Sequence, residues 1–442
     1  MENLVSWMSA NSILVNTIIL VIAYFFIVWE KVPKVTVALL GAGASLLTAV
    51  LITHHTGVGL GDYYSNFLGQ VFNVIFLLVA MMIVVNISAR SGMYTFVAEE
   101  IVKRTKGHPK TVFFALAFFT AFVSAFLDNV TTVILVMPIT YAVCKMLDIN
   151  PICFLITEIL ASNIGGTATL IGDPPNIIIG AAANFSFMDF INALTLVIFI
   201  IFLVTTFLLM FLFRKQLVKN PEKMSEVSKI DTSKTITDKP LAIRSCFVLG
   251  FIILGFVTHD MTHIPAFLIA MIAASFLLLF EDVDAIFEKV EWNTIFFFIG
   301  LFLLIGGVEA SGAIGLVGDW LLKVTQGSQS ITTDVILWGS AIVAGIIGNI
   351  PYTTALAPVI ASIEAVKGPE YVHPIWWALS LGACLGGNIT AIGAAANVIV
   401  IQSAARNGYT ITFMQFLKYG ASMTLLAIII SHIYLHVRYL MG

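Results

Sequence analysis

The chain has 442 residues, of which 59% are hydrophobic and only 11% are charged. Soluble domains normally carry about 25% charged residues, so this composition excludes an ordinary soluble protein and indicates a multi-pass protein of the lipid bilayer. The net charge of −3 says little about partners, and no nucleic-acid partner is expected. The four cysteines show no CxxC spacing and are interpreted as buried small apolar residues, so neither a disulfide nor a zinc site is predicted.

The apolar segments predict an all-α fold with five spanning helices and one re-entrant hairpin in each half of the chain. In the N-terminal repeat, 1–213, the predicted spans are 13–29, 35–53, 72–88, 152–179 and 191–213. The first hairpin, 111–146, has two legs of about 15 residues that meet at Asp128–Asn129. Legs of that length suit a segment that enters and leaves on one side of the membrane.

Residues 214–243 hold eleven charged residues and two prolines, and they predict a solvated linker between the halves. Two segments of mixed polarity, Ser91–Lys106 and Ser311–Thr325, predict interfacial amphipathic helices. In the C-terminal repeat, 244–442, the second hairpin is predicted at 334–366. The spans of this repeat are predicted at 244–258, 264–280, 293–308, 375–403 and 414–436.

The two halves are related in sequence. Asn129–Pro138 (NVTTVILVMP) recurs as Asn349–Pro358 (NIPYTTALAP) at an offset of 220 residues. Gly165–Asn176 (GGTATLIGDPPN) recurs as Gly386–Asn397 (GGNITAIGAAAN) at an offset of 221 residues. The matched residues are largely Asn, Gly, Ser, Thr and Pro, which argues against coincidence in an apolar chain. Two related halves, each with polar breaks at membrane depth, are typical of a secondary transporter.

The basic residues predict the orientation in the cell membrane, whether an inner or a plasma membrane. With the N-terminus outside, 19 of the 22 Lys and Arg residues fall in segments predicted to face the cytoplasm, as the positive-inside rule requires. The linker is then cytoplasmic. Because five spans is an odd number, the second half is an inverted repeat of the first. The two hairpins therefore open to opposite sides, which is an alternating-access geometry.

The glycine-rich breaks at Gly165–Asn176 and Gly386–Asn397 are the predicted binding region. Unpaired backbone groups cost several kcal/mol each in hydrocarbon, so the breaks must line a polar cavity. The new helix N-termini attract anions, and freed carbonyls, including those of Gly166 and Gly387, attract the coupling cation. For a single Thr, helix capping or an interhelical hydrogen bond is the simpler interpretation. The candidate substrate-binding residues are Asn129, Thr131, Thr132, Thr167, Thr169, Asn176, Asn349, Thr353, Thr354, Asn388, Thr390 and Asn397.

Three acidic residues are predicted at membrane depth. Asp128 lies at the first hairpin tip, Asp173 lies in the first break, and Glu158 lies inside an apolar helix. Ionisable groups in such positions are costly and usually mark ion or proton pathways, so these residues are expected to carry the coupling ion, H⁺ or Na⁺. The alternative for such a carboxylate, for Glu158 more than for Asp173, is an ion pair with Arg90 or a helix cap.

The two halves differ at these acidic positions. The residues equivalent to Asp128 and Asp173 are Gly348 and Ala394. Ion coupling is therefore expected to concentrate in the first half, because the second half offers no carboxylate at either position.

At these motifs the chain resembles the ion transporter superfamily, in the ArsB/NhaD permease group, and most of all its pink-eyed-dilution (P protein)-like branch. The resemblance covers nearly the whole chain apart from the linker. It is carried by FLDNVTTVILVMP (126–138), NIGGTATLIGDPPN (163–176), GNIPYTTALAP (348–358) and GACLGGNITAIGAAANV (382–398). The resemblance implies a scaffold and a transport domain, an elevator-type motion and, usually, a homodimer.

The resemblance also implies where ions bind. In related members the hairpin tips and the break loops bind sodium and substrate, so a Na⁺ site is expected at Asn129, Asp173 and Asn349. One position departs from the pattern. The P-protein-like branch has an acidic residue before the second-half Asn, whereas this chain has Gly348. One coupling-ion site is therefore expected to be weaker or absent.

These features favour a secondary active transporter and not an enzyme. The expected substrate is a small inorganic or carboxylate anion, or the neutral oxyacid As(OH)₃, with H⁺ or Na⁺ as the coupling ion and no other cofactor. Arsenite extrusion is the best-known activity of the family that the chain resembles. The alternative is a Na⁺/H⁺ antiport in which Asp128, Glu158 and Asp173 carry both ions in turn. No arginine lies at either break, which mildly disfavours large polyanions.

Two other classes fit less well. An intramembrane aspartyl protease would need Asp128 and Asp173 to share a proton. The inverted duplication has no purpose in such an enzyme, and the Gly-x-Gly-Asp pattern is missing because Leu170 precedes Ile171–Gly172–Asp173. An ion channel is disfavoured because discontinuous helices suit an occluded site better than a continuous pore.

Overall fold

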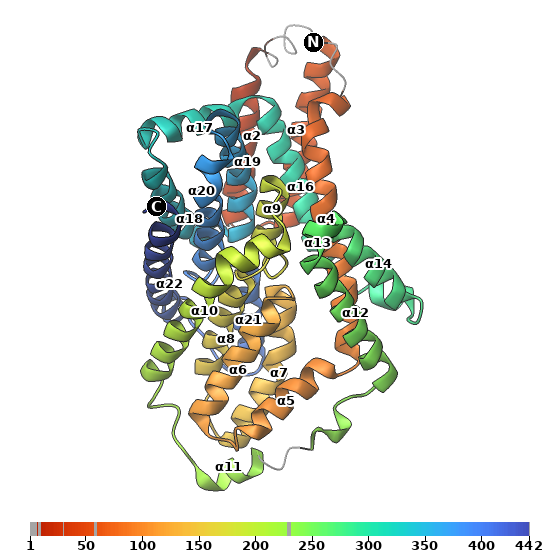
Figure 1. Ribbon diagram of the computed structural model, residues 1–442, viewed down its shortest axis with the longest axis vertical. Coiled ribbons are helices and arrows are strands. Elements are labelled where there is room, and N and C mark those ends of the chain that lie inside the picture. The colour runs from red at the N-terminus through yellow and green to blue at the C-terminus, as the bar shows by residue number, and fades with distance from the viewer. Residues whose placement is uncertain (1–6, 8–9, 30, 57–59, 228–230, 442) are drawn as a thin grey trace.

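The computed structural model describes residues 7, 10–29, 31–56, 60–227 and 231–441, which form helices joined by turns, with no β-strand among them (Figure 1). Nine of the described helices are long and apolar enough to cross a membrane. The helices of the first half are α2 (Ser12–Trp29), α3 (Lys34–Thr56), α4 (Leu60–Arg90), α5 (Met93–Arg104), α6 (Pro109–Ser124), α7 (Asn129–Leu147), α8 (Ile152–Gly166), α9 (Pro174–Ala183) and α10 (Phe187–Leu212).

The second half repeats this order after the linker helix α11 (Pro221–Val227). Its helices are α12 (Lys239–Val257), α13 (His259–Thr262), α14 (Ala266–Leu278), α15 (Val283–Phe287), α16 (Trp292–Ala310), α17 (Ala313–Val324), α18 (Gln329–Ile347), α19 (Asn349–Lys367), α20 (Pro369–Gly386), α21 (Ala395–Arg406) and α22 (Phe413–Leu435).

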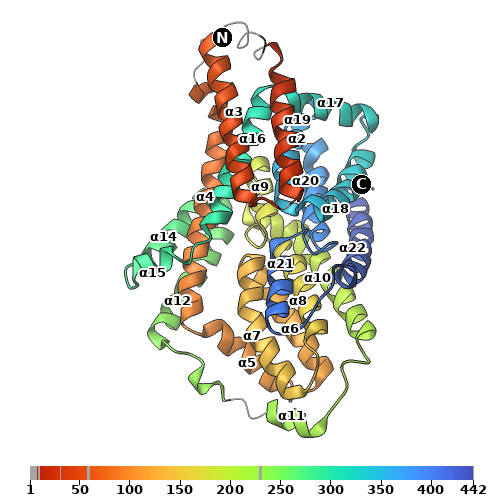
Figure 2. The same ribbon diagram turned by 180° about the vertical axis from the view of Figure 1, so that it is seen from behind.

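The second half is inverted relative to the first. The equivalent helices α5 and α17 lie at opposite ends of the molecule (Figures 1 and 2). Left-handed backbone also recurs at the predicted offset, since Gly92 before α5 has a φ of 78° and Gly312 before α17 has a φ of 85°. The prediction of an all-α membrane protein built from two inverted repeats is therefore confirmed.

Both re-entrant hairpins form. Helices α6 and α7 make the first, over 109–147, close to the predicted 111–146. Helices α18 and α19 make the second, which begins at Gln329 and not at residue 334. The earlier start follows from Ser328, whose hydroxyl caps α18 by accepting a hydrogen bond from the Ile331 N–H at 3.4 Å. A capping serine satisfies one of the unpaired N–H groups of a helix start.

Both broken helices form as well. The predicted span 152–179 is divided into α8 and α9. The predicted span 375–403 is divided into α20 and α21, and α20 begins earlier than predicted, at Pro369. Equivalent glycines let the breaks pack against the hairpins. A Cβ on Gly165 would lie 2.0 Å from the Ala121 carbonyl oxygen, and a Cβ on Gly386 would lie 2.5 Å from that of Ala341. Only glycine permits an approach this close.

The central linker packs against the end of the molecule that carries α5. It contains α11 and a short 3₁₀ turn, Thr232–Lys234. The Thr235 hydroxyl donates to Glu99 of α5 at 2.5 Å, and the Thr237 N–H donates to the Ser91 carbonyl at 3.1 Å. The linker was predicted to be a solvated tether, and its described part is held to the repeat that it follows.

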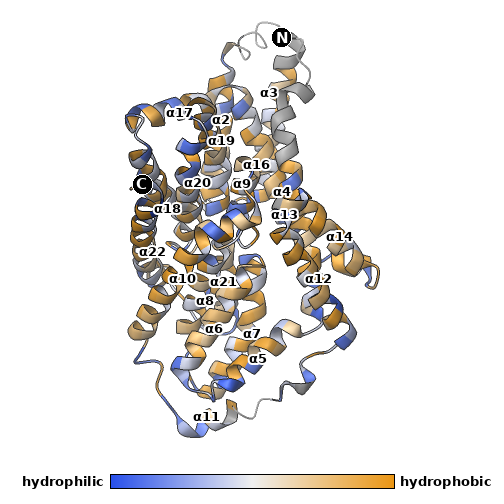
Figure 3. Ribbon diagram, in the orientation of Figure 1, coloured by the Kyte–Doolittle hydropathy of each residue, from blue (hydrophilic) through white to orange (hydrophobic). Residues whose placement is uncertain are grey.

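The outer helices expose apolar side chains, as contact with lipid requires. Figure 3 shows hydrophobic residues along α10, α12, α14 and α22, and hydrophilic residues at α11. Phe199 of α10 and Phe247 of α12 are 48% and 69% exposed. Apolar surface of this extent is unfavourable in water and favourable in hydrocarbon.

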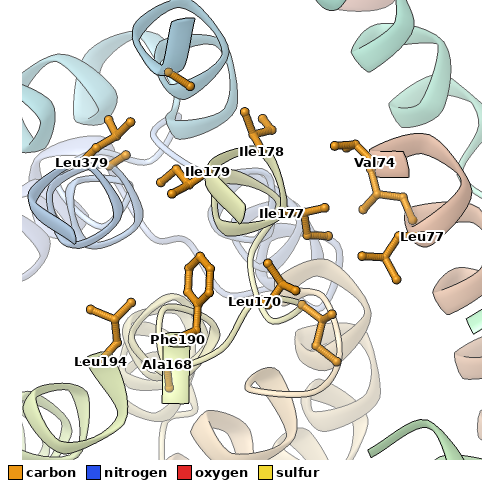
Figure 4. Close-up of a cluster of buried hydrophobic side chains, with 14 of the residues drawn as sticks. Val74, Leu77, Ala168, Leu170, Ile177, Ile178, Ile179, Phe190, Leu194 and Leu379 are labelled. Carbon is orange, nitrogen blue, oxygen red and sulfur yellow. The ribbon is translucent and has the colours of Figure 1, made fainter. Parts of the chain in front are cut away.

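The helices form two groups. The scaffold group consists of α2, α3, α4, α12, α14 and α16, and the hairpin group consists of α6 to α10 and α18 to α22 (Figures 1 and 2). An apolar seam lies between them. Figure 4 shows Val74 and Leu77 of α4 facing Ile177 of α9, with Ile178 next to it. All four side chains are buried.

Candidate functional site

A cavity of 340 Å³ lies between the scaffold group and the hairpin group. The scaffold group lines it with the first residues of α3, with part of α4 and with the start of α16. The hairpin group lines it with the N-terminal ends of α7, α9, α19 and α21. The polar lining residues are Lys34, Asp128, Asn129, Asp173, Glu291, Asn293, Thr294 and Asn349. Four predicted site residues therefore meet in one cavity: Asp128, Asn129, Asp173 and Asn349.

The first repeat places a carboxylate at the start of both of its hairpin-group helices that begin at the cavity, α7 and α9. Asp128 caps α7, because its side chain accepts hydrogen bonds from the Thr131 N–H at 2.9 Å and from the Thr131 hydroxyl at 2.5 Å. Asp173 precedes α9, whose first two residues are prolines and have no N–H to cap. Its carboxylate instead accepts from the Asn349 amide at 3.3 and 3.4 Å. The first break is thereby tied to the second hairpin tip.

The second repeat has bare helix starts at the equivalent positions. Helix α19 follows Gly348, with a φ of 96°, and α21 follows Ala394, so no side chain caps either helix. The Asn349 N–H is paired with the Gly393 carbonyl at 3.1 Å. Residues 348–349 and 394–396 line the cavity. Because a helix N-terminus carries a partial positive charge, this wall is favourable for an anion.

The scaffold wall adds polar residues that the sequence interpretation missed. Glu291 precedes α16 and accepts a hydrogen bond from the Thr294 hydroxyl at 3.0 Å, and Asn293 lies on the same wall. Lys34 was one of the basic residues that predict the membrane orientation and was not a predicted site residue. The available signal for Glu291 was a carboxylate directly before an apolar span, at a position where the first repeat has Val71.

An amide network behind the cavity joins the two breaks. The Asn129 amide donates to the Asn163 side-chain oxygen at 3.0 Å. The Asn163 amide in turn donates to the side-chain oxygens of Asn388 at 2.7 Å and Asn397 at 3.0 Å. The Ser124 hydroxyl donates to Asn129 at 2.6 Å. Asn163 is thus the central residue, and it was not among the predicted site residues, although a polar side chain inside the apolar segment of α8 was a usable signal.

Two equivalent asparagines, Asn176 and Asn397, close the breaks. Each side-chain amide donates to backbone carbonyls of its own break. The carbonyls reached are those of Gly166 (3.5 Å), Thr167 (3.1 Å), Thr169 (2.8 Å), Gly387 (2.8 Å) and Thr390 (2.9 Å). These bonds satisfy backbone groups that the breaks leave without helical partners. The carbonyls of Gly166 and Gly387, predicted to bind the coupling ion, are therefore already hydrogen-bonded.

Most of the predicted threonine hydroxyls also bond to the backbone, and none of these residues lines the cavity. The acceptors are the carbonyls of Asn163 for Thr167, Ala125 for Thr169, Asn349 for Thr353, Ile350 for Thr354 and Gly345 for Thr390. The Thr132 hydroxyl is buried and has no hydrogen-bond partner among the described residues. Substrate binding by these threonines stays a prediction, and the bonds that they make hold the breaks and hairpin tips together.

Glu158 lies between α7 and α8 and away from the cavity. The Thr140 hydroxyl donates to its Oε1, whereas its Oε2 has no hydrogen-bond partner among the described residues. Arg90 is 2.6 Å from Glu281, so the alternative of an ion pair between Glu158 and Arg90 does not hold. A role for Glu158 in coupling stays a prediction.

The three carboxylates of the cavity have different hydrogen-bond partners. Asp128 and Asp173 share no hydrogen bond among those of the described residues, because Thr131 occupies the first and Asn349 the second. Ionisable side chains at membrane depth are costly and usually mark the path of an ion or a proton.

Comparison with known proteins identifies the family. Residues 24–382 match the citrate transporter family, CitMHS. The chain is 39% identical over 425 residues to an uncharacterized transporter of Mycobacterium tuberculosis, covering 95% of this chain and 97% of that protein. It is 28% identical over 511 residues to the P protein of Homo sapiens, covering 97% of this chain and 60% of that protein.

Two solved structures share the fold. The YdaH transporter of Alcanivorax borkumensis aligns with a TM-score of 0.57 at 14% identity, over 87% of this chain and 88% of that one. MtrF of Neisseria gonorrhoeae aligns with a TM-score of 0.56 at 14% identity, over 89% of this chain and 84% of that one. The resemblance inferred from the motifs is confirmed. The chain is a membrane transporter that belongs to the CitMHS citrate transporter family, within the ion transporter superfamily.

Proposed function

We propose that this chain is a secondary active transporter that moves a small anion or oxyacid, coupled to Na⁺ or H⁺. The observation that carries the proposal is the unequal lining of the 340 Å³ cavity. Two aspartates stand at helix starts of the first repeat, and two bare helix starts of the second repeat line the same cavity. A cation and an anion can therefore bind side by side without either wall changing its charge.

The coupling cation is proposed to bind at Asp173, with Asn129 and Asn349 as amide ligands. Asp173 is 1% exposed and has no ion pair among the described residues. A buried carboxylate without a counter-ion is unfavourable, and either a proton or Na⁺ relieves that cost. Asn349 joins this carboxylate to the second hairpin, so occupation by the cation is transmitted to the bare helix start of α19.

An elevator motion is proposed from the place of the cavity between the scaffold group and the hairpin group. The apolar side chains of the seam, Val74, Leu77, Ile177 and Ile178, make no hydrogen bonds with one another. Because hydrophobic contacts are not directional, the hairpin group can slide along the scaffold group without breaking hydrogen bonds at this seam. One polar contact across the boundary is the Tyr24 hydroxyl, which donates to the Pro351 carbonyl at 2.7 Å. The orientation with the N-terminus outside and the linker in the cytoplasm, and the homodimer, stay predictions.

The proposed substrates are small. The lining residues of the cavity include one lysine, Lys34, and no arginine within the described chain. A bulky polyanion needs several cationic or N–H donors, whereas a small oxyanion or neutral As(OH)₃ can be held by helix starts and amides. Citrate, named by the family, is the largest candidate, and phosphate and arsenite are the smaller ones.

A Na⁺/H⁺ antiport is the second candidate. It is favoured by the presence of Asp128, Asp173 and Glu291 on one cavity with Lys34 as the basic residue of the lining. An excess of carboxylates suits cations that replace one another at the same site.

Flux in proteoliposomes distinguishes the two candidates. The purified protein is reconstituted with a pH-sensitive dye inside, and Na⁺, Li⁺, arsenite, citrate and phosphate are added in turn. The proposal predicts no signal with cations alone and a cation-dependent signal with one of the anions. A Na⁺-dependent proton signal in the absence of any of these anions would establish the antiport and contradict anion transport as the function.

A further inference from the structure

A cluster of metal-ligating side chains lies well outside the proposed transport cavity, where α18 meets α22. Asp334 belongs to the outer leg of the second hairpin, His432 lies in the last turn of α22, and His436 directly follows that helix. One ligand atom from each of the three residues lies within 4.8 Å of the others. Figures 1 and 2 show α22 running beside α18 near the C-terminal end of the chain.

The geometry of this cluster differs from that of an ordinary hydrogen-bonded group. His436 Nε2 lies 2.9 Å from Asp334 Oδ1 and makes a hydrogen bond. His432 Nδ1 lies 3.0 Å from the same oxygen, yet this buried nitrogen has no hydrogen-bond partner among the described residues. A buried polar atom without a partner is rare and calls for an explanation. A metal ion between the three atoms supplies one.

The local backbone also favours a site here. The spacing of His432 and His436 is i to i+4, which places both imidazoles on one face of α22. At His436 the chain changes to a short π-helix, His436–Leu440. π-helical turns are rare in proteins, and many of those that occur lie at functional sites. Two imidazoles and one carboxylate with an open position are a donor set suited to zinc and related divalent metals.

We propose that Asp334, His432 and His436 form a binding site for a divalent transition metal of the zinc type. Ligands about 2.1 Å from a tetrahedral zinc ion lie about 3.4 Å from one another. The distances of 2.9 and 3.0 Å between the carboxylate and the two imidazoles need only a slight opening to reach this spacing. Trp338 packs edge-on against His432, with ring centroids 6.3 Å apart, and so contacts one of the three ligands.

The bound metal links two helices that are far apart in sequence. His436 and Asp334 are 102 residues apart. Coordination of one metal ion by both residues would fix the outer leg of the second hairpin to α22. The site is partly accessible, because the three side chains are 22% to 36% exposed. An external metal can therefore reach it in the folded protein.

The test uses the full-length protein in detergent, with any affinity tag removed so that no additional histidines are present. Co²⁺ is titrated while its visible absorption is followed, and Zn²⁺ is then added as a competitor. We expect one equivalent of Co²⁺ to bind with a nitrogen-and-oxygen-ligated spectrum that Zn²⁺ displaces. A 100-fold excess of Zn²⁺ over its Kd is expected to raise Tm by about 3–5 °C.

The variants His432→Ala, His436→Ala and Asp334→Asn are each expected to weaken binding more than about 100-fold, because loss of even an outer partner of a ligand costs 10–100-fold. His263→Asn is the matched control, since His263 lies in a loop with a φ of 55° that Asn tolerates. Melting without metal checks that each variant folds. Absence of stoichiometric binding in the wild type, or binding that the three variants leave unchanged, would overturn the proposal.

Discussion

The tip of the first hairpin begins α7 behind Asp128, whereas the tip of the second begins α19 behind Gly348. The same contrast recurs at the breaks, where Asp173 precedes α9 and Ala394 precedes α21. The backbones of the repeats match closely enough that four equivalent helix starts point at one cavity. Side chains alone therefore decide which of these starts is acidic and which is bare. In the function that we propose, the cation binds at the acidic starts and the anion binds at the bare starts.

The glycines that both repeats share at their breaks should be the positions at which substitution destabilises the fold most. Gly165→Ala puts a Cβ 2.0 Å from the Ala121 carbonyl oxygen, and we expect it to destabilise the fold by about 3 kcal/mol or more. The measurement is thermal melting of the purified protein, with Gly386→Ala as the equivalent change. The control is Gly315→Ala in α17, where a Cβ meets no atom within 4 Å. Equal melting temperatures for all three variants would show that the close packing of the breaks is not required.

Removing the carboxylate charge of Asp173 in the first repeat should uncouple transport from the cation gradient. Asp173→Asn keeps the shape of the side chain and its contact with Asn349, but it removes the proposed cation ligand. Accumulation driven by a Na⁺ or pH gradient is expected to fall about 100-fold, the effect of losing roughly 3 kcal/mol of buried charge interaction. Uptake in proteoliposomes measures this. Full gradient-driven accumulation in the variant would remove Asp173 from the coupling mechanism.

Making the second repeat resemble the first should impair anion binding. Ala394→Asp places a carboxylate at the bare start of α21, so that it repels an anion at the N-terminus that we propose as its site. Transport of arsenite, citrate or phosphate, whichever is the substrate, is expected to fall about 10-fold, which corresponds to about 1.4 kcal/mol. Ala394→Asn, of the same size without the charge, is the control and should retain most of the rate. If both variants lose the same activity, steric exclusion and not charge is responsible.

The smallest expected effect concerns the boundary between the two groups of helices. Tyr24→Phe removes the hydrogen bond from the scaffold group to the Pro351 carbonyl at the second hairpin tip. Such a bond contributes about 1 kcal/mol, so we expect a two- to fivefold change in the initial rate of uptake. Tyr419→Phe, whose ring packs on Phe213 away from the cavity, should leave the rate unchanged. An unchanged rate for Tyr24→Phe would mean that this contact does not limit the motion.

Much of the fold was predictable because the repeat is visible in polar residues. The hairpin tips at Asn129 and Asn349 and the two breaks stand where the offsets of 220 and 221 residues place them. Helix starts were harder to predict, since they depend on caps such as Ser328, which lies six residues before the predicted start of the second hairpin. A cap acts through one local hydrogen bond and leaves little trace in hydropathy.

The site was only partly predictable, for a physical reason. A broken helix needs amides and hydroxyls to satisfy its freed carbonyls, and a substrate site needs the same residue types. Asn176 and Asn397 serve the breaks, whereas Asn129 and Asn349 reach the cavity, and composition does not distinguish these uses. Glu291 was missed because its place on the cavity comes from the packing of α16 against the hairpin tips and not from any repeat.

The central claim is that the cation binds at the acidic helix starts of the first repeat and the anion at the bare helix starts of the second. The most direct test of this claim compares two modes of transport in the same proteoliposomes. Gradient-driven uptake requires both ions, whereas exchange of labelled for unlabelled anion requires the anion site and no net gradient. The account predicts that Asp173→Asn loses gradient-driven uptake and keeps anion exchange, and that Ala394→Asp reduces both by about 10-fold. Retention of gradient-driven uptake by Asp173→Asn, or undiminished exchange by Ala394→Asp, would contradict the division of the two ions between the two repeats.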